Sequence, residues 1–210
     1  MYESEKVYIF GYSGHSYGII ETIRLVGMEI LGYFDKEEAK QNPYGLSYMG
    51  YERQVNIKNR VGQAFVFPAI GDNIVRASLV QLFDDLNMRQ FILIDPSAKI
   101  SPTAILCPST YIGKNVCINA QSKVGKGAII NTGAVIEHES KIGDFAHIAP
   151  AAVLCGDVEV GIYSFIGANA VVKQGINIGS NAVIGAGSVV LKNIPNGEVW
   201  IGNPAKKYLP

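Results

Sequence analysis

The chain has 210 residues, of which 48% are hydrophobic, and its 18 Lys and Arg residues balance its 18 Asp and Glu residues. This length and hydrophobicity allow one or two domains with a buried core, and the even charge argues against nucleic acid as a partner. We expect neither export nor membrane insertion, because no leader pattern and no long apolar run is found. Three cysteines without disulfide or metal-ligand spacing favour a reducing, cytoplasmic location.

The first 94 residues alternate between β-favouring runs and helical patterns, which is typical of a small parallel α/β domain of the Rossmann type. The expected elements, in order, are a strand at 6–10, a helix that ends at Gly27, strands at 29–34 and 64–70, a helix capped by Asp72 or Asn73, and a strand at 91–94.

A glycine-rich turn, Gly11-x-x-Gly14-x-x-x-Gly18, follows the first expected strand and opens the first helix. Free N–H groups and the helix dipole favour an anion such as phosphate at this place. Asp35 ends the second strand, where a carboxylate can accept hydrogen bonds from a nucleotide. The spacing differs from the GxGxxG of dinucleotide enzymes, so we do not expect NAD or FAD. A tight turn without a ligand is the alternative.

From residue 94 to residue 190 the chain repeats every six residues. Seventeen consecutive positions at this spacing, from Ile94 to Val190, are Ile, Leu or Val, and mostly small residues stand four positions after each. A period of six fits neither a helix nor a hairpin ladder. It fits a solenoid with three short sides, in which one branched aliphatic per side fills the bore. The sequence therefore predicts a parallel β-helix over residues 95–210, including a C-terminal tail.

Two of the three histidines, His138 and His147, lie in this repeat. His138 follows the inward Ile136 by two positions, so it belongs to a corner and points outward. Glu139 beside it can hold one imidazole tautomer and raise its basicity, as a general base requires, although simple solvation is the alternative. Nine residues are half of an 18-residue coil, so the two histidines project from opposite sides of one prism. A shared site would lie between two prisms, and we expect a homotrimer.

The hexads, the segment Glu137-His138-Glu139 and the terminal Gly-Asn-Pro-Ala-Lys at 202–206 resemble the left-handed β-helix acyltransferases that use acetyl-CoA. With the Gly-x-Ser-Gly-His turn at 11–15, nearly the whole chain is similar to the nucleotide-sugar acetyltransferases of the NeuD family, and most of all to its PglD-type branch of the bacillosamine pathway. The resemblance implies transfer of acetyl from acetyl-CoA to the 4-amino group of a UDP-linked 4-amino-4,6-dideoxy sugar, without a metal.

The resemblance also implies catalytic roles at matching positions. His138 would take a proton from the attacking amine, and Glu139 would raise its basicity. The backbone N–H of Gly156 would stabilise the oxyanion of the thioester, which commonly is the largest contribution in acyl transfer. The amine would attack directly, so no acyl-enzyme is expected.

Binding roles follow from the same resemblance. His147 would contact the acetyl end of acetyl-CoA, and the main chain at Ala168 and Ala186 would bind its pantetheine arm. Lys36 departs from the family, which carries an acid there, so the resemblance does not fix how the nucleotide is recognised. The residues implied in binding the UDP-sugar are Ser13, Gly14, His15, Asp35, Lys36 and Gly71.

Other functions remain open at this point. The same His–Glu pair would serve an O-acetyltransferase acting on sialic acid or another sugar, and the front turn does not distinguish UDP from GDP or dTDP. A zinc hydratase on the same solenoid needs three histidine ligands, and the repeat holds two. A non-catalytic sensor of nucleotide sugars would not need the Glu-His-Glu segment.

Overall fold

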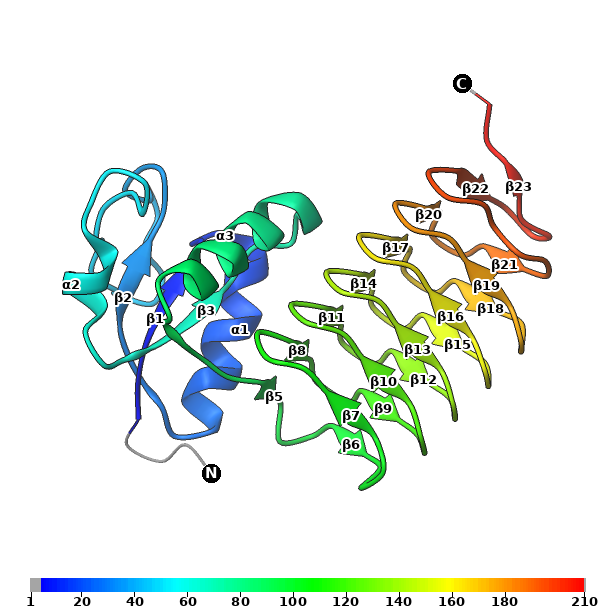
Figure 1. The fold of residues 1–210 in the computed structure, drawn as a ribbon, viewed down its shortest axis with the longest axis horizontal. Helices are drawn as coiled ribbons and strands as arrows, with labels where there is room; N and C mark the ends of the chain where they lie inside the picture. Colours follow the sequence, from blue (N-terminus) through cyan, green and yellow to red (C-terminus); the bar gives the residue numbers. More distant parts are fainter. Residues whose placement is uncertain (1–4, 210) are drawn as a thin grey trace.

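The computed structural model describes residues 5–209. An α/β front domain stands at one end of a long three-sided solenoid, and the C-terminus lies at the far end (Figure 1). Both parts of the predicted fold are therefore confirmed.

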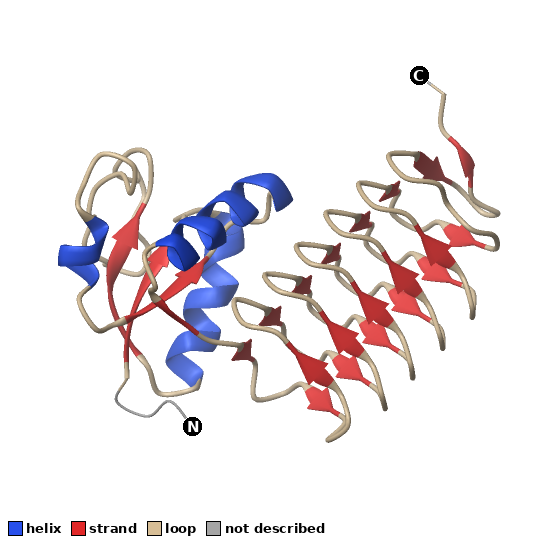
Figure 2. Cartoon of the chain, in the orientation of Figure 1, coloured by secondary structure: helices blue, strands red, loops and turns tan. Residues whose placement is uncertain are grey.

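The front domain is a four-stranded parallel sheet in the order β2-β1-β3-β4, with helices packed on it (Figure 2). Its elements are β1 (Lys6–Phe10), α1 (Gly14–Leu25), β2 (Glu29–Phe34), α2 (Ile57–Val61), β3 (Phe65–Pro68), α3 (Asn73–Asp85) and β4 (Arg89–Gln90). The sheet order places β1 between β2 and β3, so the connection after β1 and the connection after β3 run in opposite directions.

The structure differs from the sequence expectation at two places. The strand expected at 91–94 is shortened to β5 (Leu93–Ile94), which pairs with the solenoid, and β4 completes the front sheet just before it. The short helix α2 was not expected; its N-terminus is capped by Asn56, whose side chain accepts from the N–H of Asn59. The expected cap of α3 is confirmed, since Asp72 accepts from two N–H groups of the first turn.

The solenoid consists of seventeen two-residue strands, β5 to β21, and each ends on one of the predicted aliphatic positions. After β5 they are β6 (Lys99–Ile100), β7 (Ile105–Leu106), β8 (Tyr111–Ile112), β9 (Cys117–Ile118), β10 (Lys123–Val124), β11 (Ile129–Ile130), β12 (Val135–Ile136), β13 (Lys141–Ile142), β14 (His147–Ile148), β15 (Val153–Leu154), β16 (Glu159–Val160), β17 (Phe165–Ile166), β18 (Val171–Val172), β19 (Asn177–Ile178), β20 (Val183–Ile184) and β21 (Val189–Val190). The tail adds β22 (Val199–Ile201) and β23 (Lys206–Lys207), which pair antiparallel.

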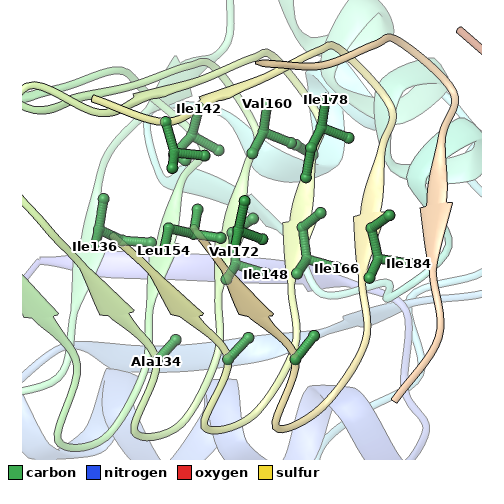
Figure 3. Close-up of a cluster of buried hydrophobic side chains, with 14 of the residues drawn as sticks. Ala134, Ile136, Ile142, Ile148, Leu154, Val160, Ile166, Val172, Ile178 and Ile184 are labelled. Atoms are coloured by element: carbon green, nitrogen blue, oxygen red, sulfur yellow. The ribbon is translucent and has the colours of Figure 1, made fainter. Parts of the chain in front are cut away.

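Strands eighteen residues apart pair in parallel and form three faces, here called the five-, six- and eight-stranded faces. The second residue of each strand points into the bore, where Ile136, Leu154 and Val172 form one of the columns in Figure 3. Small hydroxyl residues between strands also face inward, and Ser122 donates to the carbonyl of Glu137 in the next coil. The core is therefore continuous along the rod.

The front domain shares a core with the near end of the solenoid. Leu93, Tyr111 and Ile129, the outward residues of the eight-stranded face, pack with Ile19 and Ile23 of α1. This contact covers the first coils of that face, and Asn73 of α3 reaches further along the rod, where its side-chain amide donates to the carbonyl of Tyr163.

A buried arginine connects the two parts. Arg76 on α3 is 1% exposed, and burial lowers its pKa to about 9, so the guanidinium stays charged at neutral pH. All its acceptors are neutral oxygens, and two belong to the solenoid. It donates to the carbonyls of Gly127, Phe145, Ile70 and Gly71 and to the amide oxygen of Asn73.

Arg76→Met should lower the free energy of unfolding by about 3 kcal/mol or more, because it leaves several buried oxygens without donors. Urea denaturation followed by circular dichroism measures this loss. Arg60→Met is the matched control, since Arg60 is exposed and donates to a single carbonyl. Similar losses in the two variants would contradict the role of Arg76 as the connection.

Candidate active site

His138 stands at the corner between β12 and β13, where the six-stranded face meets the five-stranded face. Its side chain is 49% exposed, and its Nδ1 lies 3.1 Å from Oε2 of Glu139. Glu139 has a left-handed backbone, with φ of 63°, as do the matching corner residues of many coils. The corner thus turns the carboxylate toward Nδ1, and this contact leaves Nε2 free to accept a proton.

Gly156 lies in the next coil, eighteen residues after His138, and the imidazole rests against it. A Cβ at this position would stand 2.4 Å from Cε1 of His138, so any larger residue would displace the ring. The N–H of Gly156 has no hydrogen-bond partner among residues 5–209. A free donor therefore lies beside a free imidazole nitrogen.

Ala168 and Ala186 occupy the same phase of the hexad as Gly156, two residues after the inward aliphatic. Within the described part of the chain, their N–H groups are also unpaired. They lie at corners between the eight- and six-stranded faces. The predicted catalytic corner and the predicted pantetheine positions therefore border opposite edges of the six-stranded face.

His147 lies elsewhere, on the eight-stranded face where the front domain meets the solenoid. It is 8% exposed, and its Nε2 is 3.2 Å from the amide nitrogen of Asn131. Backbone hydrogen bonding to Gly71 favours a proton on its ring. The ring of His147 therefore contacts both the side chain of Asn131 and the backbone of Gly71.

His15, in the first turn of α1, lies at the same place. The contact region between the front domain and the solenoid that holds His15, Gly71 and His147 is here called the junction. Its ring centroid is 6.1 Å from that of His147 and 6.2 Å from that of Tyr111. Gly71 packs close to it, since a Cβ there would lie 3.7 Å from the ring. Nε2 of His15 is buried and has no partner among the described residues. A buried nitrogen without a partner is costly unless a ligand supplies the hydrogen bond.

Both junction histidines are held neutral. Burial, and then the charge of Arg76, lowers the pKa of His15 to about 4. Burial lowers the pKa of His147 to about 3, and Arg76 and His15 add to this effect. At neutral pH the two rings therefore offer hydrogen-bonding nitrogens without adding charge.

The remaining predicted residues frame the start of α1. Ser13 and Gly14 are exposed at its first turn. Asp35 accepts from the backbone N–H of Tyr12 at 2.9 Å and from that of Lys36 at 2.7 Å. Its carboxylate thus fixes the glycine-rich turn and the residue after β2, and the Lys36 side chain is exposed.

The structure therefore divides the predicted residues into two groups within one chain. His138, Glu139 and Gly156 form the corner, whereas His15, Gly71 and His147 form the junction, beside the turn that Asp35 holds. Sequence reasoning missed two members of the junction, Asn131 and Arg76. Asn131 stands at the hexad position where Gly, Asn and Asp are common, so the sequence gives no sign that it belongs to a site. Arg76 did give a signal in the sequence, because its charge interrupts the apolar stripe of α3 that includes Leu79, Val80 and Phe83.

No three His, Cys, Asp or Glu side chains between residues 5 and 209 are grouped so that they would hold a metal ion. Within the same residues, no helix is long and apolar enough to cross a membrane.

Acid should destabilise the fold through the two junction histidines. Their pKa values lie below the ordinary 6.5, so the unfolded chain takes up protons first as the pH falls. Each should remove about 2 kcal/mol from the free energy of unfolding between about pH 7.5 and about pH 5. Denaturation at the two pH values measures this. The double variant His15→Gln/His147→Gln should lose less of its free energy of unfolding between these two pH values. If its pH dependence equalled that of the natural protein, the two histidines would not be held neutral in the folded state.

Comparisons with known proteins show which family the chain belongs to. Residues 6–83 match the model of the PglD N-terminal domain, and residues 158–192 match that of the hexapeptide repeat of succinyl-transferase. A mutant of perosamine N-acetyltransferase from Caulobacter crescentus, in complex with CoA and GDP-perosamine, is similar with a TM-score of 0.93 and 34% identity over 98% of this chain and 97% of that chain.

A second solved structure is the acetyltransferase domain of PglB from Neisseria gonorrhoeae in complex with acetyl coenzyme A. It has a TM-score of 0.89 and 29% identity, over 98% of this chain and all 100% of that one. WeeI from Acinetobacter baumannii, at 21% identity and a TM-score of 0.86, shares the fold. The chain belongs to the NeuD/PglD-type family of acetyl-CoA-dependent sugar N-acetyltransferases, whose left-handed β-helix is built from hexapeptide repeats.

Proposed function

We propose that the protein transfers acetyl from acetyl-CoA to the 4-amino group of a nucleotide-linked 4-amino-4,6-dideoxy sugar. The observation that carries this proposal is the outer corner where His138 is paired with Glu139 and rests on Gly156. The relatives support the sugar class, because one was solved with GDP-perosamine and the front domain matches that of PglD.

At the corner, His138 accepts a proton as the sugar nitrogen forms a bond to the thioester carbon. The N–H of Gly156 stabilises the negative charge that develops on the thioester oxygen. When the carbon–sulfur bond breaks, His138 returns the proton to the leaving sulfur, so atoms and charge balance. Glu139 holds the Nδ1 proton and favours the imidazolium that forms in between.

Binding of the two substrates follows from the remaining residues. The free N–H groups of Ala168 and Ala186 suit the amide carbonyls of a pantetheine arm, and His147 would lie toward the acetyl end. Ser13 and Gly14 offer the start of α1 to the sugar phosphates. His15 supplies its unpaired nitrogen to the sugar nucleotide.

A single chain does not bring the corner and the junction together, which supports the homotrimer. Outward residues of the five-stranded face include Lys123, Lys141 and Glu159, as expected for a solvated surface. Those of the six-stranded face are mostly apolar and suit burial against a second copy. They are Lys99, Cys117, Val135, Val153, Val171 and Val189. Packed around a three-fold axis, the corner of one chain would meet the junction of the next.

His138→Ala should lower turnover by about two to three orders of magnitude, the usual contribution of a general base. It should leave thermal stability nearly unchanged, because the side chain is half exposed. Release of the free thiol of CoA with UDP-, GDP- and dTDP-linked 4-amino sugars measures the loss. Gln174→Ala, an exposed residue of the same hexad phase, is the control. Undiminished turnover in His138→Ala would contradict the proposed function.

Two inactive variants should restore activity when they assemble together. His138→Ala has a defective corner and an intact junction, whereas His15→Ala has an intact corner and a defective junction. Because each site takes its corner from one chain and its junction from the next, about a quarter of the sites in trimers mixed from equal parts are intact. The two proteins are denatured together, refolded and assayed for thiol release, with each variant refolded alone as the control. No recovery in the mixture, or an active particle with the mass of one chain, would contradict a shared site.

A further inference from the structure

The front domain contains a hollow that shares one residue, Lys36, with the residues implied above in binding the sugar nucleotide. It has a volume of about 290 Å³ and lies between the residue after β2, the connection at 51–53 and the first turns of α3. Its lining residues are Lys36, Tyr51, Glu52, Arg53, Ile74, Val75, Ser78 and Leu79. It therefore lies at the carboxyl end of the parallel strands, where ligands usually bind in such sheets.

The hollow begins at Lys36, the residue that follows Asp35 and lies near the glycine-rich turn. Asp35 connects them, because its carboxylate accepts from the N–H of Tyr12 in the turn and from the N–H of Lys36 at the edge of the hollow. A nucleoside diphosphate with its phosphates at Ser13 and Gly14 would thus extend past Asp35. Its base would enter the hollow.

The walls suit a flat, partly apolar group. Ile74 and Val75, on the first turn of α3, are 60% and 42% exposed, although large aliphatic side chains are usually covered. Tyr51 adds an aromatic surface, and Leu79 is buried beneath. A nucleobase stacked here would cover apolar side chains that the rest of the chain leaves open.

One polar group of the hollow lacks a partner of opposite charge. The carboxylate of Glu52 is half-buried, and burial raises its pKa. It forms no ion pair with any residue between 5 and 209. The neighbouring guanidinium of Arg53 donates instead to the hydroxyl of Ser78. Hydrogen bonding from the backbone of Glu52 itself offsets part of the rise in its pKa, and the carboxylate still has acceptor sites for a ligand with two adjacent N–H donors.

We propose that this hollow binds the base of the sugar nucleotide and that Glu52 selects guanine. Guanine presents its N1–H and its 2-amino group side by side, so a carboxylate accepts from both. Uracil and thymine present one N–H between two carbonyl oxygens, and the second carboxylate oxygen would then face a carbonyl. Lys36 and Arg53, which lie on the same hollow, can donate to the O6 of guanine. This inference rests on the proposed function, and it assigns the nucleotide that the acetyl-transfer site leaves open.

Isothermal titration calorimetry with GDP, IDP, UDP and dTDP tests the assignment without any acetyl transfer. GDP should bind at least about 10-fold more tightly than UDP or dTDP, and IDP, which lacks the 2-amino group, should lie between them. Glu52→Gln should weaken the binding of GDP by roughly 10- to 100-fold, which is the range expected when a bidentate contact to a base is lost. It should change UDP binding by less than about 3-fold and bring IDP close to GDP.

Glu38→Gln is the matched control, because Glu38 is exposed on the same connection but does not line the hollow. It should leave all four affinities unchanged, and circular dichroism confirms that both variants fold. Equal binding of GDP and UDP by the natural protein, or an equal loss for all nucleotides in Glu52→Gln, would overturn the assignment of guanine and leave the acetyl transfer intact. Failure of all four nucleotides to bind would overturn the nucleotide-sugar function itself.

Discussion

The narrow bore of the solenoid is the constraint on which the rest of the structure depends. It admits one branched aliphatic from each strand, as the column of Ile136, Leu154 and Val172 shows (Figure 3), and each such burial contributes about 1.5–3 kcal/mol. A shift by one residue would turn every inward side chain outward, so the register cannot slip. Outward residues eighteen apart are stacked as a consequence. The contact of His138 with Gly156 is one such pair, and the chemistry of the corner thus follows from the packing inside.

The same regularity explains what the sequence reveals and what it hides. The hexads predict every strand of the rod from β5 to β21 and place His138 at an outward corner, because the period alone fixes both. The surroundings of His147 depend on how the front domain packs against the eight-stranded face. No local pattern encodes that contact. The separation of β4 from β5 and the short helix α2 could not be predicted for the same reason. Whether such short elements form depends on the tertiary contacts that they make.

Arg76 is an intermediate case. Its position within the apolar stripe of α3 marks it as unusual in the sequence, but its purpose becomes visible only when Gly127 and Phe145 of the solenoid are seen to accept from it. Burial is the main cause that keeps the imidazoles of His15 and His147 neutral, and the charge of Arg76 adds to it. One residue therefore both attaches the front domain and helps to keep the junction neutral.

The two parts of the molecule divide the work of recognition according to their regularity. Ala168 and Ala186 lie eighteen residues apart, so their free N–H groups recur along one edge of the rod, and in the proposed function they bind the arm of CoA, whatever the acceptor sugar. Residues 35–56 follow no period, and loops of this kind change without disturbing a core. Lys36 and Glu52 lie there. The choice of nucleotide can thus vary in the front domain while the proposed catalytic corner, held by the packing of the bore, stays the same.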